Sequence, residues 1–481
     1  MSAGAEVDLV VVGGGVSGLA AAWEGVARGA SVLVLEASGR AGGEIVTSPF
    51  AGGAVDEAAD AFLGRVPEGT QLCAELGIEG ELVSPATGGA YVWTGGALRR
   101  LPSEQLLGLP TDLDALAASG ILSPAGLDRV REDLKGGGPA GDAGPGRAAG
   151  DPPAGDDEAV GDLVRRHLGE EVLDRLVSPL LGGIWAADTD RLSLQVAAPQ
   201  VAAVRDRVAE HGGSLVAAAA AARADQLAAA AAAGDRPVFL APRGGMGRLV
   251  GTLSERLGDR VRTGSPVTGL VAEGGRWRVE PAGVVAGAVV VATPAHATAP
   301  LVAPHEPGAA AFLRGIDHAS VTLVSLAVPR EAVDHPLDGS GFLVPRSSGR
   351  LLTACSWFSS KWAHHAGDGS TVLLRASAGR DGDDRQAGLD DDAVVAAVMD
   401  DLRETMGLRG APTEVRVSRW PRSFPQPRPG HLAALAAAEA DLADAAPRLA
   451  VTGAWARGVG VPACIRGGRS AARRALHIAA T

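Results

Sequence analysis

The apolar and polar positions of the first 36 residues predict a strand, a helix and a second strand. Residues 7–12 form an apolar run suited to a buried strand, and an alanine-rich helix follows from residue 16. A second apolar run, 31–35, ends at Glu36. The glycine-rich turn Gly13–Gly18 joins the first strand to the helix. This order of strand, glycine turn, helix, strand and acid is typical of a dinucleotide-binding βαβ unit.

The glycine turn has the features that hold a pyrophosphate. Gly13 permits the tight turn, Gly15 lets the backbone approach the phosphates, and Gly18 lets the helix pack closely on the strand. The N-terminus of the helix offers N–H groups that favour an anion. Glu36 can accept both hydroxyls of a ribose. The candidate cofactor-binding residues of this turn are Gly13, Gly14, Gly15, Val16, Ser17 and Gly18.

The pattern between residues 47 and 194 predicts short hairpins and helices. Residues 47–56 and 91–98 predict hairpins, the second of them around Thr94-Gly95. Start and stop signals predict the helices. These helices are 67–76, two within 101–134 that begin at Pro102-Ser103 and at Ser123-Pro124, 160–168, and 170–181 before the turn Gly182-Gly183.

The second half of the chain contains most of the predicted strands. The run from 136 to 157 is rich in Gly, Pro, Ala and Asp and has no apolar periodicity, so it predicts a surface loop without chemistry. Apolar runs at 261–270, 276–280 and 284–292 predict further strands of the first domain. Four more runs predict an antiparallel sheet in a second domain: 321–328, 341–344, 351–355 and 371–376.

Composition restricts the classes of function. The chain has 481 residues, of which 46% are hydrophobic, enough for about two to three domains. A net charge of −12 disfavours a nucleic-acid partner. The cysteines Cys73, Cys355 and Cys464 are far apart and give neither a disulfide framework nor a metal-binding spacing. No signal peptide precedes the first strand, and the tract 215–234 is only weakly apolar, so we expect a cytoplasmic protein.

The residues that follow the second strand resemble the E-x-x-x-R-x-G-G signature of flavoproteins in the amine-oxidase and protoporphyrinogen-oxidase group. In that group the arginine and the second glycine pair lie beside the pyrophosphate of FAD. A nicotinamide dehydrogenase does not need this second glycine turn, so the expected cofactor is FAD. The matching residues here are Glu36, Ala37, Arg40, Gly42, Gly43 and Glu44.

Later motifs resemble the protoporphyrinogen and coproporphyrinogen oxidases, including versions from high-GC Gram-positive bacteria, and occur in the same order. The resemblance covers nearly the whole chain except 136–157. Pro462-Ala463 departs from it, since the family often has Asn-Asp there. The matching motifs are Gly182-Gly183-Ile184-Trp185 with Asp188, Gly244-Gly245-Met246, Trp420-Pro421 with Pro425-Gln426, and Gly458-Val459-Gly460-Val461.

The resemblance implies further contacts with FAD. Val267 lies where the backbone of the family contacts the adenine, and Trp420 would lie near the flavin. Val459, Gly460 and Val461 would place N–H groups and a helix N-terminus at the pyrimidine edge of the flavin. No metal site is implied.

The resemblance also implies a substrate pocket. Gly183 would open space beside a large flat ligand. Leu343, Cys355 and Leu374 fall at pocket-facing positions, and ordinary strand core is the equal alternative for each. Arg375 lies inside an apolar strand and needs an anionic partner, either a substrate propionate or an acid of the chain. No acid–base pair has a recognisable spacing, so no catalytic side chain is named.

The implied fold is α/β (α+β overall), with a discontinuous Rossmann-like FAD-binding domain, an inserted antiparallel-sheet substrate domain and a helical lobe. The FAD-binding domain would comprise 1–85, 236–295 and 441–481. The substrate domain would comprise 86–100, 206–235 and 296–440, and the helical lobe 101–205.

The implied reaction is the oxidation of a porphyrinogen to a porphyrin in heme biosynthesis, with O2 as the electron acceptor and H2O2 as a product. A pyrrole nitrogen lone pair would expel hydride from an adjacent carbon to flavin N5, so the cofactor carries the difficult step. The preferred substrate would be coproporphyrinogen III, with protoporphyrinogen IX also oxidised. The alternative is protoporphyrinogen IX as the sole physiological substrate.

Two other functions remain as alternatives. A flavin amine oxidase would share the FAD motifs, but it typically holds its amine between aromatic rings, and this chain has 3% aromatic residues with a single tyrosine, Tyr91. A flavin-binding assembly protein without turnover is the second. The expected partners are the porphyrinogen and O2, with no nucleic acid. Peripheral membrane contact, hand-off to a ferrochelatase and the oligomeric state are left open.

Overall fold

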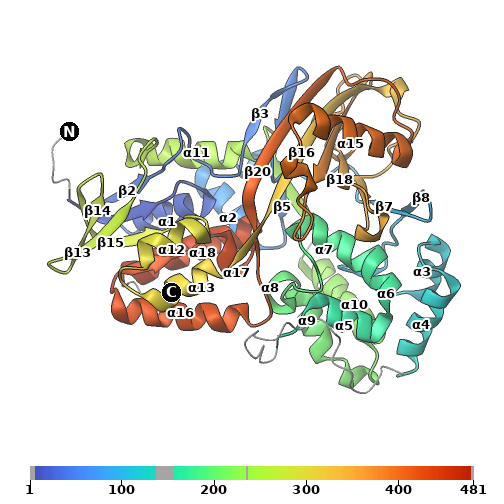
Figure 1. Ribbon diagram of the computed structural model, residues 1–481, viewed down its shortest axis with the longest axis horizontal. Coiled ribbons are helices and arrows are strands. Elements are labelled where there is room, and N and C mark those ends of the chain that lie inside the picture. The colour runs from blue at the N-terminus through green and yellow to red at the C-terminus, as the bar shows by residue number, and fades with distance from the viewer. Residues whose placement is uncertain (1–5, 137–156, 234–236, 478–481) are drawn as a thin grey trace. The chain divides into compact units, whose positions relative to one another are not determined.

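The computed structural model describes residues 6–136, 157–233 and 237–477, which fold into two compact units (Figure 1). The first unit comprises Met1–Ser84, Pro237–Asp317 and Leu432–Thr481. The second comprises Pro85–Arg236 and His318–His431. The loop predicted over 136–157 lies, apart from its two ends, outside the described residues.

The first unit contains the predicted Rossmann-like sheet, with strand order β12-β2-β1-β15-β14-β13 and β21 beside β15. β1 pairs in parallel with β2 and with β15, so that Val10 lies opposite Leu33 on one side and Val289 on the other. β13, β14 and β15 form an antiparallel meander. The strands are β1 (Glu6–Val12), β2 (Val32–Leu35), β12 (Val261–Arg262), β13 (Gly269–Glu273), β14 (Arg276–Glu280), β15 (Val284–Val291) and β21 (Leu449–Val451).

Helices lie on both faces of this sheet because successive strand residues point to opposite faces. Leu9 of β1 contacts the face of α1, where a Cβ on Gly25 would lie 3.0 Å from the Leu9 Cδ2. Val10 and Val12 point to the other face and share a core with α12, α13 and α16. The helices of this unit are α1 (Val16–Ala27), α2 (Pro67–Leu76), α11 (Gly247–Leu257), α12 (Ala295–Val302), α13 (Pro307–Arg314), α16 (His431–Ala445), α17 (Ala454–Arg457) and α18 (Val461–Ala475).

The structure groups α12, α13 and nearly all of α16 with the first unit, whereas the sequence analysis assigned residues 296–440 to the substrate domain. The reason is packing, because the buried side chains of these helices complete the core over β1 and β15. The buried side chains of these helices that fall within 296–440 are Ala299, Leu301, Val302, Ala309, Ala310, Leu313, Leu435 and Ala438. The first unit also holds the predicted hairpin β3 (Thr47–Phe50) and β4 (Gly53–Asp56), and a small sheet of β5 (Phe62–Leu63), β11 (Phe239–Pro242) and β6 (Leu82–Val83).

The second unit is built around a sheet with the order β20-β16-β19-β18-β17-β7-β8. The prediction of an antiparallel sheet is confirmed for β16, β19, β18 and β17, whereas β17 and β7 pair in parallel. The strands are β7 (Tyr91–Thr94), β8 (Ala97–Arg100), β16 (Asp317–Pro329), β17 (Gly341–Leu343), β18 (Leu352–Trp357), β19 (Thr371–Ala378) and β20 (Glu414–Gln426).

Helix α15 covers one face of this sheet (Figure 1). Its residues Val394, Val398 and Leu402 are fully buried against Trp357 and Val324 of the sheet. The predicted helical lobe belongs to the same unit. The helices of the second unit are α3 (Leu113–Ser119), α4 (Pro124–Leu134), α5 (Val160–Leu168), α6 (Glu170–Val172), α7 (Ser178–Trp185), α8 (Leu194–Ala197), α9 (Pro199–Asp206), α10 (Leu215–Ala233), α14 (Phe358–Lys361) and α15 (Asp391–Met406).

Two predicted helix boundaries were wrong. No helix begins at 102–103. The described chain instead forms two short strands there, β9 (Gln105–Leu106) and β10 (Leu109–Pro110). Helix α3 begins after Asp112, whose side chain accepts the N–H of Ala115. Gly182 and Gly183 lie inside α7, because the helix continues to Trp185 and ends at Ala186 with a φ of 49°. In the described part of the chain, none of the helices combines the length and hydropathy that a bilayer crossing requires.

Candidate functional site

In the first glycine turn, Gly18 packs against protein, whereas Gly15 faces open space. A Cβ on Gly18 would lie 1.9 Å from the carbonyl oxygen of Gly13, so only glycine allows α1 this close to the turn. Gly13 has a φ of 101°, which favours glycine. A Cβ on Gly15 would meet a single atom within 4 Å, the Cα of Gly43 at 3.8 Å. Gly15 therefore leaves room for a ligand above the turn.

The second glycine turn packs directly against the first. Gly42 donates its N–H to the carbonyl oxygen of Gly14 at 2.8 Å. A Cβ on Gly43 would lie 3.0 Å from the Cα of Gly15. Arg40 donates from Nη2 to the carbonyl oxygen of Gly43 at 2.7 Å. The two turns therefore form one cradle, which we call the glycine cradle, with the exposed guanidinium of Arg40 at its edge.

Glu36 ends β2 at this cradle, as the sequence predicted. Its Oε2 accepts the N–H of Gly14 at 2.6 Å. Its Oε1 accepts the N–H and the hydroxyl of Ser38, at 2.8 and 2.7 Å. An ionised carboxylate has about four lone-pair sites, so a half-buried Glu36 keeps capacity for ribose hydroxyls. Ala37, which lies between Glu36 and Ser38, is exposed.

Helices α1 and α18 of the first unit both begin at a glycine and have no side-chain cap among the described residues. α1 starts from Gly15, and α18 starts from Gly460. Gly468 of α18 lies so close to α1 that a Cβ would be 2.0 Å from the carbonyl oxygen of Ser17. Pro462 occupies the first turn of α18, where an N–H would have no partner within the helix, so the departure from the family's Asn-Asp keeps the helix start. Both N-termini thus offer N–H groups to an anionic ligand.

These features fit a dinucleotide cofactor. The open space over Gly15, the acid at the end of β2 and the uncapped start of α1 supply room, ribose acceptors and anion donors in one place. The remaining predicted residues of the α18 turn lie together, with Val461 buried, Val459 half-buried and Gly460 exposed. In the described chain, no group of three or more His, Cys, Asp or Glu side chains is arranged to hold a metal ion.

The second unit has a small cavity of about 90 Å³ beside α7. Gly183 lines it, and a Cβ there would lie 3.3 Å from the Cδ2 of Leu343. Gly183 is exposed, and its role of opening room beside a ligand stays a prediction. Arg346 and Arg380 also line this cavity, together with Val344, Thr353 and the turn that follows α7.

Cys355 and Leu374 lie in the core of the second unit, where each is 1% exposed. Burial raises the pKa of the Cys355 thiol above its usual range, so this thiol stays protonated. The burial of Cys355 and Leu374 favours the alternative that both are ordinary core residues of their strands. Arg375 of β19 is half-buried, and its guanidinium carbon lies 4.6 Å from the ring centre of Phe358, a cation–π distance.

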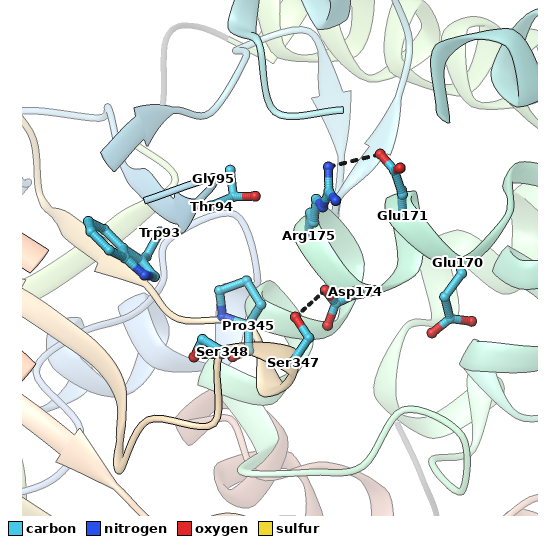
Figure 2. A pocket seen from close by; sticks show the side chains of 10 residues that line it. All are labelled: Trp93, Thr94, Gly95, Glu170, Glu171, Asp174, Arg175, Pro345, Ser347 and Ser348. Atoms are coloured by element: carbon cyan, nitrogen blue, oxygen red, sulfur yellow. Dashed lines mark hydrogen bonds and ion pairs between the residues drawn. The ribbon is translucent and has the colours of Figure 1, made fainter. Parts of the chain in front are cut away.

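A larger cavity of about 440 Å³ shares Glu170 and Asp174 with the small one, and Figure 2 shows the residues that line it. Trp93 of β7 lines one side, and Glu170, Asp174 and Arg175 line the other. Arg175 pairs with Glu171 at 2.9 Å. Three carboxylates against one paired arginine make this cavity acidic, so it is poorly suited to the carboxylates of a porphyrinogen.

A comparison with known proteins decides the family. The model of the family described as flavin containing amine oxidoreductase matches residues 16–476. The chain belongs to this family. The flavin cofactor and the fold class that the sequence predicted for this flavoprotein are thereby confirmed.

Individual relatives match this flavoprotein over almost its whole length. A coproporphyrinogen III oxidase of Bacillus subtilis (strain 168) is 33% identical over 97% of this chain and 97% of its own. One of Mycobacterium tuberculosis (strain ATCC 25618 / H37Rv) is 34% identical over 95% and 94%. A crystal structure from Exiguobacterium sp. 255-15, provisionally named a protoporphyrinogen oxidase, superposes with a TM-score of 0.83 at 26% identity and covers 99% of both chains.

Two predicted cofactor residues of the flavoprotein lie away from the glycine cradle in the chain. Val267 precedes β13 and packs, partly buried, against the core of the first unit. Trp420 is half-buried on β20 of the second unit. Their contacts with FAD stay predictions.

Sequence reasoning missed the residues that support the Gly-Gly-Met segment. Asp56 accepts the N–H of Met246 at 2.9 Å, and Thr47 accepts the N–H of Gly247 at 2.7 Å. Thr47 also donates its hydroxyl to Asp56. These side chains come from the β3–β4 hairpin and satisfy the start of α11. Their separation from α11 in the chain left no local signal, except that Thr and Asp favour such backbone contacts.

Glu44, beside Gly43, is the titrating group of the glycine cradle. Although its side chain is accessible to solvent, the surrounding protein removes part of its hydration and raises the pKa of Glu44 to about 7, from a usual value of 4.5. The charge of Glu44 in turn contributes, after burial, to raising the pKa of Cys464 in α18 to about 11. Glu44 therefore lies near the start of α18.

We expect Glu44→Gln to change how the stability of the flavin-free protein depends on pH. Because the folded state holds the Glu44 proton more tightly than the unfolded state, wild-type stability falls as the pH rises from about 4.5 through 7. Glu44→Gln has no carboxyl group at this position, so its stability does not fall in this way as the pH rises. Its thermal midpoint should match the wild type at low pH and exceed it above neutrality, by a modest amount because water still reaches the side chain. Parallel pH profiles for the two proteins would contradict this account of Glu44.

Proposed function

We propose that this flavoprotein oxidises coproporphyrinogen III to coproporphyrin III, with O2 as the electron acceptor and H2O2 as the second product, in heme biosynthesis. Protoporphyrinogen IX would be oxidised as well. The observation that carries the proposal is the match, over nearly the whole length of each chain, to relatives named coproporphyrinogen III oxidase. Four acids and three arginines line the small cavity of the second unit. Two of these arginines, Arg346 and Arg380, make no short ion pair within the described chain and add chemical support, because coproporphyrinogen III carries propionates where protoporphyrinogen IX has vinyl groups.

The chain supplies binding and electrostatics, while the bound flavin supplies the hydride acceptor. The glycine cradle and the start of α1 would hold the pyrophosphate, and Glu36 would hold a ribose, because these residues leave space, N–H donors and acceptor oxygens in one place. The N–H groups at the start of α18 favour negative charge at the site. In the second unit, Gly183 lies beside Leu343 and leaves room for part of the substrate at the small cavity. Orientation and exclusion of water are the contributions expected from such residues.

The position of Trp455 argues against an amine oxidase of the aromatic-cage type. Trp455 and Trp420 are the candidates for a pair of cage rings in this chain. Trp455 is 3% exposed, and its indole N–H donates to the carbonyl oxygen of Thr293 at 3.0 Å. A ring fixed in the core of the first unit does not present a face to an amine.

A parallel steady-state assay tests the proposal. Coproporphyrinogen III, protoporphyrinogen IX and putrescine would be offered separately, with porphyrin fluorescence and peroxide followed together. We expect the highest kcat/KM with coproporphyrinogen III, a lower value with protoporphyrinogen IX and no turnover of the amine. A preference for the amine, or failure of both porphyrinogens with a flavin-loaded protein, would overturn the proposal.

Gly183→Leu should impair the substrate site without impairing the fold. The new side chain would extend into the small cavity, while leucine favours the helix in which Gly183 lies. Crowding of this kind costs about 1–3 kcal/mol, so we expect kcat/KM to fall about tenfold or more at an unchanged flavin content. Gly388→Leu is the matched control, since no atom lies within 4 Å of its Cβ position. Equal kinetics of the two variants would exclude Gly183 from the substrate site.

A further inference from the structure

A buried arginine that lacks a full partner lines the small cavity of the second unit. Arg380, two residues after β19, is 8% exposed. Its Nε has no hydrogen-bond partner within the described residues. Its ion pair with Asp383 spans 3.8 Å, longer than a hydrogen bond. Asp383 is held instead by Arg385, which donates to both of its oxygens at 2.8 and 2.9 Å.

A second arginine without a carboxylate partner lines the same cavity. Arg346 donates from Nη2 to the carbonyl oxygen of Asp381 at 2.7 Å, and among the described side chains it has no ion pair. Burial, and after it the charge of Arg346, lower the pKa of Arg380 to about 10. Two guanidinium groups that repel one another at a cavity wall are stabilised by an anion between them.

The acids that line this cavity make their short contacts with groups other than Arg346 and Arg380, and the charge of Asp174 stabilises Arg380 only in part. Arg165 also lines the cavity, and it is paired with two of these acids, Glu170 and Asp190. Glu170 and Asp190 accept from Arg165 at 2.7 and 2.9 Å, Asp174 accepts from the hydroxyl of Ser347 at 2.5 Å, and Asp188 accepts from the N–H of Asp190 at 3.1 Å.

The size of the cavity limits what can enter it. The cavity has a volume of about 90 Å³. A site for a whole drug-sized ring system has roughly 300–1,000 Å³. The cavity therefore suits an arm that ends in a small anionic group.

We propose that Arg346 and Arg380 form a subsite for a propionate carboxylate of the porphyrinogen. The inference rests on the proposed function, which supplies a substrate with such arms. A guanidinium matches a carboxylate through paired N–H donors, and this pairing satisfies the Arg380 group that the chain leaves incomplete. The subsite favours the porphyrinogen that carries more propionates.

Arg380→Gln tests the subsite by a change in KM. For coproporphyrinogen III we expect KM to rise about tenfold or more with little change in kcat, since the lost contact holds a charged arm and not the reacting carbon. With the methyl ester of the same porphyrinogen, the variant and the wild type should have the same KM. Binding of the product coproporphyrin III, followed by fluorescence, should weaken by the same factor as KM rises.

Arg175→Gln is the matched control, because Arg175 lines the neighbouring acidic cavity and is paired with Glu171 (Figure 2). It should leave KM for the free acid unchanged. Arg346→Gln replaces Arg380→Gln if the latter does not fold or does not bind flavin. An unchanged KM and unchanged product binding in a folded, flavin-loaded Arg380→Gln would overturn the subsite while the proposed function stands. A wild type that oxidises no porphyrinogen would remove the proposed function and the subsite together.

Discussion

Gly15→Val should yield a folded protein that no longer holds flavin. The backbone of Gly15 has a φ of −69°, which any residue can adopt, and a Cβ there would meet only Gly43 Cα, at 3.8 Å. The valine side chain would therefore occupy the space over the glycine cradle that the pyrophosphate needs. A loss of about 3 kcal/mol in binding weakens affinity for FAD about a hundredfold. The flavin content after purification and a titration with added FAD measure the effect.

A matched substitution separates this effect from a general cost of replacing glycine. Gly80→Val in the first unit introduces the same side chain where no atom lies within 4 Å of the Cβ position. This control should keep its flavin. The thermal midpoint of flavin-free Gly15→Val should lie close to that of the flavin-free wild type. A yellow Gly15→Val protein would show that the pyrophosphate does not lie over Gly15.

Gly18→Val should destabilise the protein itself. A Cβ on Gly18 would lie 1.9 Å from the carbonyl oxygen of Gly13 and 3.3 Å from the Cβ of Ala292, so α1 would have to move away from the turn and from β15. Overpacking against backbone atoms costs about 3 kcal/mol or more. The free energy of unfolding, measured without flavin for Gly18→Val and Gly15→Val, should fall sharply for the first variant only. Equal stabilities of the two variants would refute the separate roles assigned to these glycines.

The sequence predicted the glycine cradle well because its parts are local. Gly18, Glu36 and the second glycine turn follow one another within a single βαβ unit, and each has a short-range physical reason for its residue type. The α18 turn was found through a resemblance, and its packing against α1 at Gly468 appears only in the structure.

Long-range packing accounts for what the sequence did not predict. The assignment of α12, α13 and α16 to the first unit depends on contacts with Val10 and Val12, which lie far away in the chain. The sequence singled out Arg375, whose guanidinium carbon lies 4.6 Å from the ring centre of Phe358, but it did not single out Arg380, which lines the small cavity. A strand pattern shows that an arginine is buried, but the partners around it come from other elements.

The central claim is that this protein holds a flavin that takes electrons from a porphyrinogen. The most direct measurement mixes the flavin-loaded protein with coproporphyrinogen III in the absence of oxygen and follows the flavin absorption together with porphyrin fluorescence. We predict loss of the oxidised flavin spectrum as porphyrin appears, and recovery of the spectrum with formation of peroxide when oxygen is admitted. A flavin spectrum that stays unchanged at saturating porphyrinogen would contradict the account.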